Sequence, residues 1–119
     1  MPRLLDLCRS LPGATEDVKW DNDLVFSVGG KMFACFALPE GCPLSFKVDP
    51  DTFDVLTGQP GIRPAPYLAK HGWVSVEHDE TLPAEVLEEL LEESHTLVAS
   101  KLPKSRRVAL GLPDTITSL

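Results

Sequence analysis

The residues of this sequence best suited to chemistry are cations, which could contact the phosphate groups of a nucleic acid. Lysine and arginine displace the counterions condensed on DNA, and this release supplies much of a protein's affinity for it. Eight such side chains are the candidate contacts: Lys31, Lys47, Arg63, Lys70, Lys101, Lys104, Arg106 and Arg107. Simpler roles remain open: Lys31 could be a solvated hairpin cation, and Lys47 could lie along a sheet in a salt bridge.

The segment from Gly61 to Val74 combines prolines, aromatic residues and cations without the period of a helix or strand. Prolines lack an N–H and fix their own φ, so this composition predicts a stiff surface loop. Within it, Tyr67 and Trp73 could stack on a base or another flat ligand. Large aromatic residues beside prolines more often fasten a loop to the core, and that alternative also remains open.

Patterns typical of enzymes and metal sites are not found in this sequence. The serines lack a nucleophile-elbow pattern, and no glycine-rich phosphate loop opens a helix. The three histidines, His71, His78 and His95, show no i, i+4 spacing that would point two imidazoles from one helix face. The three cysteines form no CxxC pair, and the expected strand register keeps Cys35 and Cys42 apart, so we expect reduced thiols. We therefore expect no enzyme, no cofactor and no metal site.

The charge pattern opposes the nucleic-acid hypothesis overall but leaves room for it locally. The formal net charge is −7. Residues 77–93 contain eight carboxylates and no Lys or Arg, whereas residues 101–107 contain four cations. The helix dipole favours such a helix, with an acidic body and a basic exit, so a solvated face with a matched terminus also explains the pattern. Because salt screens charges beyond about 8 Å, a basic patch could still bind phosphate.

The size and composition indicate one globular domain. The chain has 119 residues, of which 43% are hydrophobic and 24% charged, and its apolar runs are too short to cross a bilayer. The first residues lack the continuous apolar core of a secretory signal. We expect a cytoplasmic protein without a membrane span.

The expected elements begin with a helix and a meandering sheet. Apolar residues at helical spacing from Leu4 to Leu11 predict a first helix, and residues 15–20 predict an edge strand. Two strands, 24–28 and 31–38, flank Gly29-Gly30, which is a two-residue hairpin signal. With Val28 opposite Lys31, the predicted pairs on one face are Phe26 with Phe33 and Leu24 with Cys35.

The rest of the chain predicts two strands and two further helices. A strand over residues 44–48 points Lys47 away from the core, and Asp49-Pro50 then caps a helix that ends near Gly58. A last strand covers residues 73–77. The final helix begins around residues 81–83 and ends before Pro103, with an apolar stripe of Val86, Leu87, Leu90, Leu91, Leu97 and Val98. The tail from Arg106 to Leu119 could dock on the body or remain mobile, and its apolar residues favour docking.

These elements predict an α+β fold, a single two-layer domain with helices packed on a mainly antiparallel sheet of about five strands. The expected order is α-β-β-β-β-α-β-α.

Several segments together resemble the MmcQ/YjbR-like family of small bacterial proteins. They are LPGATED with Trp20, GGKMFA, LSFKVDP, PGIRPAPYLAKHGWV and SHTLVASKLPK. Their order and spacing run across nearly the whole chain, so residues 1–119 are identified as one MmcQ/YjbR-like domain. The resemblance implies a fold similar to secretion chaperones and frataxin, which for this family is described as a DNA-binding double wing.

Two hypotheses follow. The resemblance implies a non-catalytic DNA-binding module that uses the eight cations and the two loop aromatic residues. The alternative is a protein-interaction or chaperone-like module, whose acidic surface attracts a basic partner segment.

Overall fold

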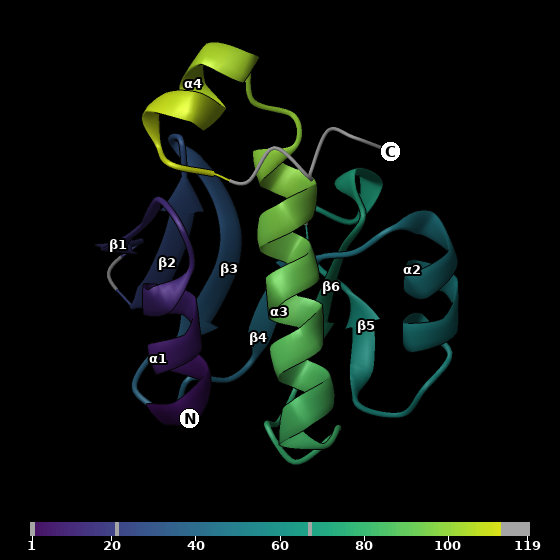
Figure 1. Ribbon diagram of the computed structural model, residues 1–119. Helices are drawn as coiled ribbons and strands as arrows, with labels where there is room; N and C mark the ends of the chain where they lie inside the picture. Colours follow the sequence, from purple (N-terminus) through teal and green to yellow (C-terminus); the bar gives the residue numbers. More distant parts are fainter. Residues whose placement is uncertain (1, 21, 67, 113–119) are drawn as a thin grey trace.

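An antiparallel sheet of six strands carries the fold, and the helices pack against it (Figure 1). The computed structural model describes residues 2–20, 22–66 and 68–112. The helices are α1 (Pro2–Ser10), α2 (Pro50–Thr57), α3 (Ala84–Ala99) and α4 (Lys104–Ala109), with a short 3-10 helix, η1 (Ala69–His71). The strands are β1 (Ala14–Lys19), β2 (Asp23–Val28), β3 (Lys31–Ala37), β4 (Leu44–Lys47), β5 (Ile62–Pro64) and β6 (Trp73–Val76).

The layers have the predicted α+β arrangement. The strand order is β1-β2-β3-β4-β6-β5. Helix α3 lies across β2, β3 and β4, with α1 beside it toward β1, while α2 packs on β5 and β6 (Figure 1). In the part of the chain that the structure describes, no helix is both long and apolar enough to cross a membrane.

Besides the short η1, two elements of the structure are absent from the predicted order. Residues 62–64 form the edge strand β5, where Ile62 pairs with Val76 and Pro64 with Val74, so the predicted loop is wrong there. Three residues are too few to show a strand period, and an edge strand tolerates proline because its outer side needs no N–H. The chain after Pro103 forms α4 and buries Leu112. The remainder of the predicted docking tail, residues 113–119, lies outside the described residues.

The predicted hairpin between β2 and β3 is confirmed. Gly29 and Gly30 have φ values of +59° and +82°, and Val28 lies opposite Lys31. A Cβ on Gly29 would lie 2.6 Å from a methyl carbon of Leu102. The hairpin turn therefore packs closely against the chain that leaves α3, which brings the start of β3 next to the end of that helix.

Beyond the turn, the predicted register is wrong by one residue. A bulge between Phe26 and Ser27 shifts the pairing, so that Phe26 lies opposite Ala34 rather than Phe33. A bulge places two residues of one strand against one of its partner and re-aims the side chains. As a result, Phe33 and Phe36 both lie in the core, with ring centroids 6.2 Å and 5.7 Å from that of Phe26.

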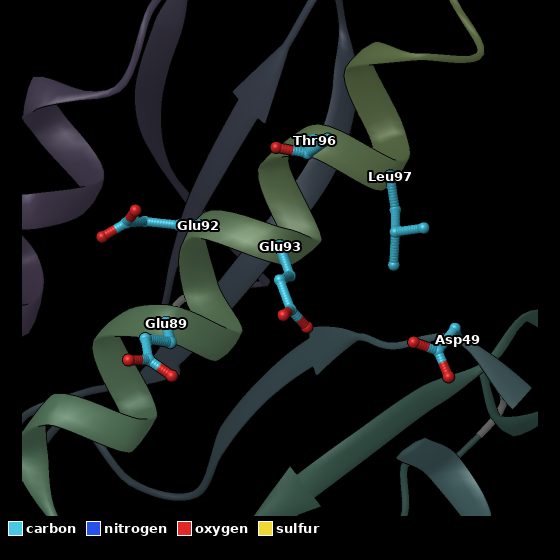
Figure 2. A pocket seen from close by; sticks show the side chains of 6 residues that line it. All are labelled: Asp49, Glu89, Glu92, Glu93, Thr96 and Leu97. Atoms are coloured by element: carbon cyan, nitrogen blue, oxygen red, sulfur yellow. The ribbon is translucent and has the colours of Figure 1, made fainter. Parts of the chain in front are cut away.

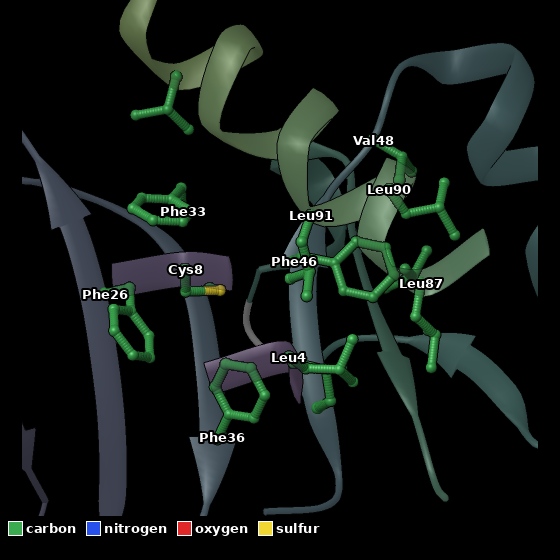
Figure 3. Packing of buried hydrophobic residues seen from close by; sticks show 14 of the residues in the cluster. Leu4, Cys8, Phe26, Phe33, Phe36, Phe46, Val48, Leu87, Leu90 and Leu91 are labelled. Atoms are coloured by element: carbon green, nitrogen blue, oxygen red, sulfur yellow. The ribbon is translucent and has the colours of Figure 1, made fainter. Parts of the chain in front are cut away.

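The core fills the space between the sheet and the helices α1 and α3 (Figure 3). Its fully buried rings come from the sheet, and α3 contributes Leu87 and Leu91. The predicted stripe on α3 is partly wrong, because Val86 is 37% exposed while Ser94 and His95 are buried. Two polar side chains on the buried face need hydrogen-bond partners, and one of them organises the candidate site.

Candidate anion-binding site

Three lysines from separate parts of the fold line one pocket of about 320 Å³. Lys31 is the first residue of β3, Lys47 the last of β4, and Lys101 follows the end of α3. The complete lining is Lys31, Met32, Lys47, His71, Trp73, Val98 and Lys101. We call this the lysine pocket. The fold thus gathers three cations that are widely separated along the chain.

Ser94 of α3 fixes the strand ends at this pocket. Its Oγ donates to the carbonyl of Phe33 at 2.6 Å and accepts from the backbone N–H of Lys47 at 2.9 Å. The paired residues of β3 and β4 end at Ala34 and Phe46, so the hydroxyl bridges the two strands where their pairing ends. Serine interrupts the apolar stripe of α3, and that interruption was the signal in the sequence for this role.

The turn that carries Lys70 and His71 packs against the end of β4. Gly72 has φ +83°, and its carbonyl accepts from the N–H of Val48 at 2.9 Å. A Cβ at Gly72 would lie 2.8 Å from the carbonyl oxygen of Val48. This close backbone approach needs glycine both for its φ and for space. It holds His71 at the edge of the lysine pocket.

The aromatic residues predicted to stack on a ligand have a different setting. Trp73 begins β6 opposite Lys47 and is 5% exposed, so it forms a wall of the pocket rather than an open stacking face. Tyr67 lies outside the described residues.

Two lysines of the pocket act on the third, Lys47. Burial lowers the pKa of Lys47, and the charges of Lys101 and Lys31 lower it further. None of the salt bridges among the described residues includes Lys31, Lys47 or Lys101. An anion between these ammonium groups would offset their repulsion. The site is therefore electrostatically prepared for negative charge.

A larger pocket of about 530 Å³ adjoins the lysine pocket and shares Lys47, His71 and Lys101 with it. Lys70 also lines this second pocket, together with the carboxylates of Asp49 and Asp54. A ligand that extends from the lysine pocket in this direction would meet charges of both signs.

A third pocket, of about 430 Å³, is acidic. Its lining is Asp49, Glu89, Glu92, Glu93, Thr96 and Leu97, and we call it the acidic pocket. Figure 2 shows Glu93 extending from α3 toward the segment that holds Asp49, while Glu92 projects to the other side of the helix. The Asp49 carboxylate caps α2 as predicted: it accepts from Thr52 N at 2.8 Å, which lowers the pKa of Asp49.

The other five predicted cations do not line the lysine pocket, and of these only Lys70 lines the adjoining one. Arg63 lies 3.7 Å from Glu77 at the far edge of the sheet. Lys104 and Arg106 are exposed on α4. Arg107 turns back, and its Nη1 donates to the carbonyl of Leu102 at 2.6 Å, so it fastens α4 to the exit of α3.

His95 and the three cysteines lie outside the pockets described above. The Nε2 of His95 donates to the carbonyl of Pro12 at 2.7 Å, its ring lies edge-on to Phe33, and burial lowers its pKa. The three cysteines are free, as expected, and burial raises the pKa of Cys8 to about 12 and that of Cys35 to about 11. Among the described residues, no group of three or more His, Cys, Asp or Glu side chains is arranged to hold a metal ion.

Comparisons with known proteins agree on one family. The family model described as YjbR matches residues 9–97. The uncharacterized protein YbdF of Escherichia coli O157:H7 is 34% identical over 92 residues, which cover 73% of this chain and 75% of that protein.

Two solved structures have the same fold. The Deinococcus radiodurans protein DR2400, from the domain family DUF419, superposes with a TM-score of 0.84 at 39% identity, covering 95% of this chain and 88% of that one. A Pseudomonas syringae protein superposes with a TM-score of 0.66 at 22% identity, covering 82% and 97%, and this likeness concerns the fold alone.

Proposed function

The chain belongs to the YjbR family, and from this premise we propose that it is a non-catalytic, cytoplasmic module that binds nucleic acid through phosphate contacts in the lysine pocket. The relatives named above carry no enzymatic name. The observation that carries the proposal is the convergence of Lys31, Lys47 and Lys101 on one pocket, with none of them in a salt bridge within residues 2–20, 22–66 and 68–112.

The contrast with other cations of the chain supports this reading. Arg3 lies 2.6 Å from Glu88, and Arg9 lies 2.8 Å from Glu16. Each of these arginines is neutralised by a nearby carboxylate, as expected for a chain in which acidic residues outnumber basic ones. The lysines of the pocket are gathered instead with one another, an arrangement that raises the electrostatic energy of the unliganded protein and favours binding of an anion.

The acidic surface limits the extent of the proposed interface. With a net charge of −7, a long stretch of duplex would meet repulsion beyond the pocket. Three or four phosphate contacts predict a logarithmic salt slope of about −2 to −3.5. Binding should therefore be short, local and moderately salt-dependent.

The test is fluorescence anisotropy of labelled single-stranded and duplex DNA at about 50 and about 200 mM salt, a range that separates phosphate contacts from other binding. The variant Lys47→Glu/Lys101→Glu should abolish binding. The matched control, Lys104→Glu/Arg106→Glu, makes the same charge change on α4 and should retain most of it. If the control variant loses binding and the pocket variant keeps it, the proposed site is wrong.

The acidic pocket favours a second candidate function, an interaction with a basic protein segment. Glu89, Glu92 and Glu93 are exposed on one stretch of α3, next to Asp49. Calorimetric titration with a lysine-rich peptide should show binding that Glu92→Lys/Glu93→Lys removes. If the two proteins bind the peptide equally, this candidate is excluded.

A further inference from the structure

We propose that the lysine pocket binds a phosphate monoester, the group found at the end of a nucleic-acid strand or on a free nucleotide, in preference to an internal phosphodiester. This inference rests on the proposed function and specifies its ligand. Three features of the pocket carry it: the number of charges, the nature of the walls and the acidic surroundings.

The number of cations fits a doubly charged group. A phosphate monoester carries about −1.5 to −2 charges near pH 7 and presents three terminal oxygens, whereas an internal diester carries a single charge. Lys31 of β3, Lys47 of β4 and Lys101, in the turn after α3, line the pocket. We expect a compact dianion to interact with these ammonium groups together, because its oxygens point in several directions. A diester joins a neighbouring sugar on both sides, which leaves fewer free oxygens.

The walls of the pocket strengthen charge interactions within it. Met32, Trp73 and Val98 are apolar or aromatic, and the last two are buried. Such walls lower the local dielectric, so that each ammonium interacts more strongly with an anion than it would on an open surface. The lowered pKa of Lys47 shows that this partial removal from water already acts on one lysine. With about 320 Å³, the pocket has the size of a small-ligand site.

The surroundings oppose a continuous strand. The adjoining pocket is lined by Asp49 and Asp54 as well as Lys70, and Asp49 also lines the acidic pocket. A strand bound through an internal phosphate would leave the pocket in two directions, and in one of them it would pass these carboxylates. A terminal phosphate needs only one path, so the end of a strand avoids this repulsion.

The experiment compares two oligonucleotides that differ only at one end. A 3′-labelled single strand of about 12 nucleotides is prepared with a 5′-phosphate and with a 5′-hydroxyl, and both are titrated by anisotropy at about 100 mM salt. Adenosine monophosphate, with adenosine as its control, is tested separately by calorimetry. We expect the 5′-phosphate to tighten binding at least tenfold.

The variants locate the effect. Lys47→Met and Lys101→Met should remove the advantage of the 5′-phosphate, whereas Lys104→Met, the same substitution on α4, should keep it. Circular dichroism and thermal melts confirm folding, and the lost advantage must appear in variants that melt cooperatively. If Lys104→Met removes the advantage while both pocket variants keep it, the site is wrong.

Each outcome decides between the two proposals. Equal affinities for the two oligonucleotides overturn the monoester inference and leave nucleic-acid binding standing. Binding of adenosine monophosphate, but of neither oligonucleotide nor adenosine, supports the monoester chemistry and overturns nucleic acid as the ligand. If no probe binds, both proposals fail.

Discussion

The lysine pocket and the acidic pocket lie along the same helix, yet their charges are held in different ways. Glu89, Glu92 and Glu93 are exposed residues of α3. In the lysine pocket, Lys47 is half-buried on a strand end that Ser94 fixes to α3. A row of exposed glutamates needs only a solvated helix face, whereas the lysine pocket requires several elements to meet.

The fold constrains the positions of the lysines more than those of the glutamates. Water screens the exposed carboxylates, so their mutual repulsion affects stability little. Lys31 and Lys101 are also exposed, but Lys47 is half-buried beside apolar walls, and its pKa is lowered by burial and by the charges of the other two. Sites where like charges lower the stability of the folded protein are often functional, because a bound ligand of opposite charge offsets the repulsion.

The largest expected effect comes from Gly72→Ala, which disturbs the turn between His71 and Trp73, two residues that line the lysine pocket. The new Cβ would meet the carbonyl oxygen of Val48 at 2.8 Å, and alanine is strained at φ +83°. We expect a loss of about 2–4 kcal/mol in the free energy of unfolding, measured by urea denaturation. Gly111→Ala is the control, because its φ is +72° but no atom lies within 4 Å of the new Cβ. Equal losses at the two glycines would show that packing against β4 is unimportant.

Ser94→Ala should have the next largest effect. It removes the bridge between Phe33 and Lys47 and leaves a backbone carbonyl and an N–H without this partner. A loss of about 1–3 kcal/mol is expected in the same assay, with weakened anion binding. Ser100→Ala, at the half-buried end of α3, serves as a comparison because, among the described residues, its Oγ donates to the carbonyl of Leu97 within the same helix and bridges no strands. An unchanged stability of Ser94→Ala would rule out the bridge as a structural element.

The buried side of α3 predicts a dependence of stability on pH. Burial lowers the pKa of His95 below its ordinary value of 6.5, so the unfolded chain binds a proton more readily than the folded one. The contribution of neutral His95 to the free energy of unfolding is therefore complete above about pH 6.5 and is lost as the pH falls from there through the folded pKa. Urea midpoints at pH 7.5, 6.5 and 5.5 should show this decline.

His95→Gln is the control, since glutamine can still donate to the carbonyl of Pro12 but does not titrate. The decline above pH 5 should flatten in this variant. Carboxylates with lowered pKa values, such as Asp49 and Glu88, lose their contribution only at lower pH, below about 4.5. A decline between pH 6.5 and 5.5 that is unchanged in His95→Gln contradicts the assignment to His95.

The smallest expected effects on stability come from one substitution in each pocket, and they compare the two pockets directly. Lys47→Met removes one of three like charges and keeps the apolar stem, so we expect a gain of about 0.5 kcal/mol in unfolding free energy. Glu93→Gln, the matched change in the acidic pocket, should stay within about 0.5 kcal/mol of the wild type in either direction. Inorganic phosphate should raise the melting temperature of the wild type and of Glu93→Gln, but much less that of Lys47→Met. A destabilised Lys47→Met would show that the lysines do not repel one another.

Local signals made much of the fold predictable from the sequence. The hairpin at Gly29-Gly30 and the cap at Asp49 depend on neighbouring residues, and both are confirmed. The bulge beside Phe26 and the bridge formed by Ser94 depend on packing between distant elements. Sequence periodicity carries no record of such packing.

The candidate site was predictable only as a set of cations. The eight side chains included Lys31, Lys47 and Lys101, but nothing local distinguishes them from Lys104 on α4. Their meeting depends on the contact of the hairpin with Leu102 and on the strand order of the sheet. These are properties of the folded chain.

The most direct test of the lysine pocket is a map of amide chemical shifts in ¹⁵N-labelled protein during titration with the 5′-phosphorylated oligonucleotide. We predict saturable shifts centred on Lys31, Lys47, His71, Trp73 and Lys101, with the amides of the acidic pocket little changed. Shifts centred on α4 or on the acidic pocket, with those five amides unmoved, would contradict the account.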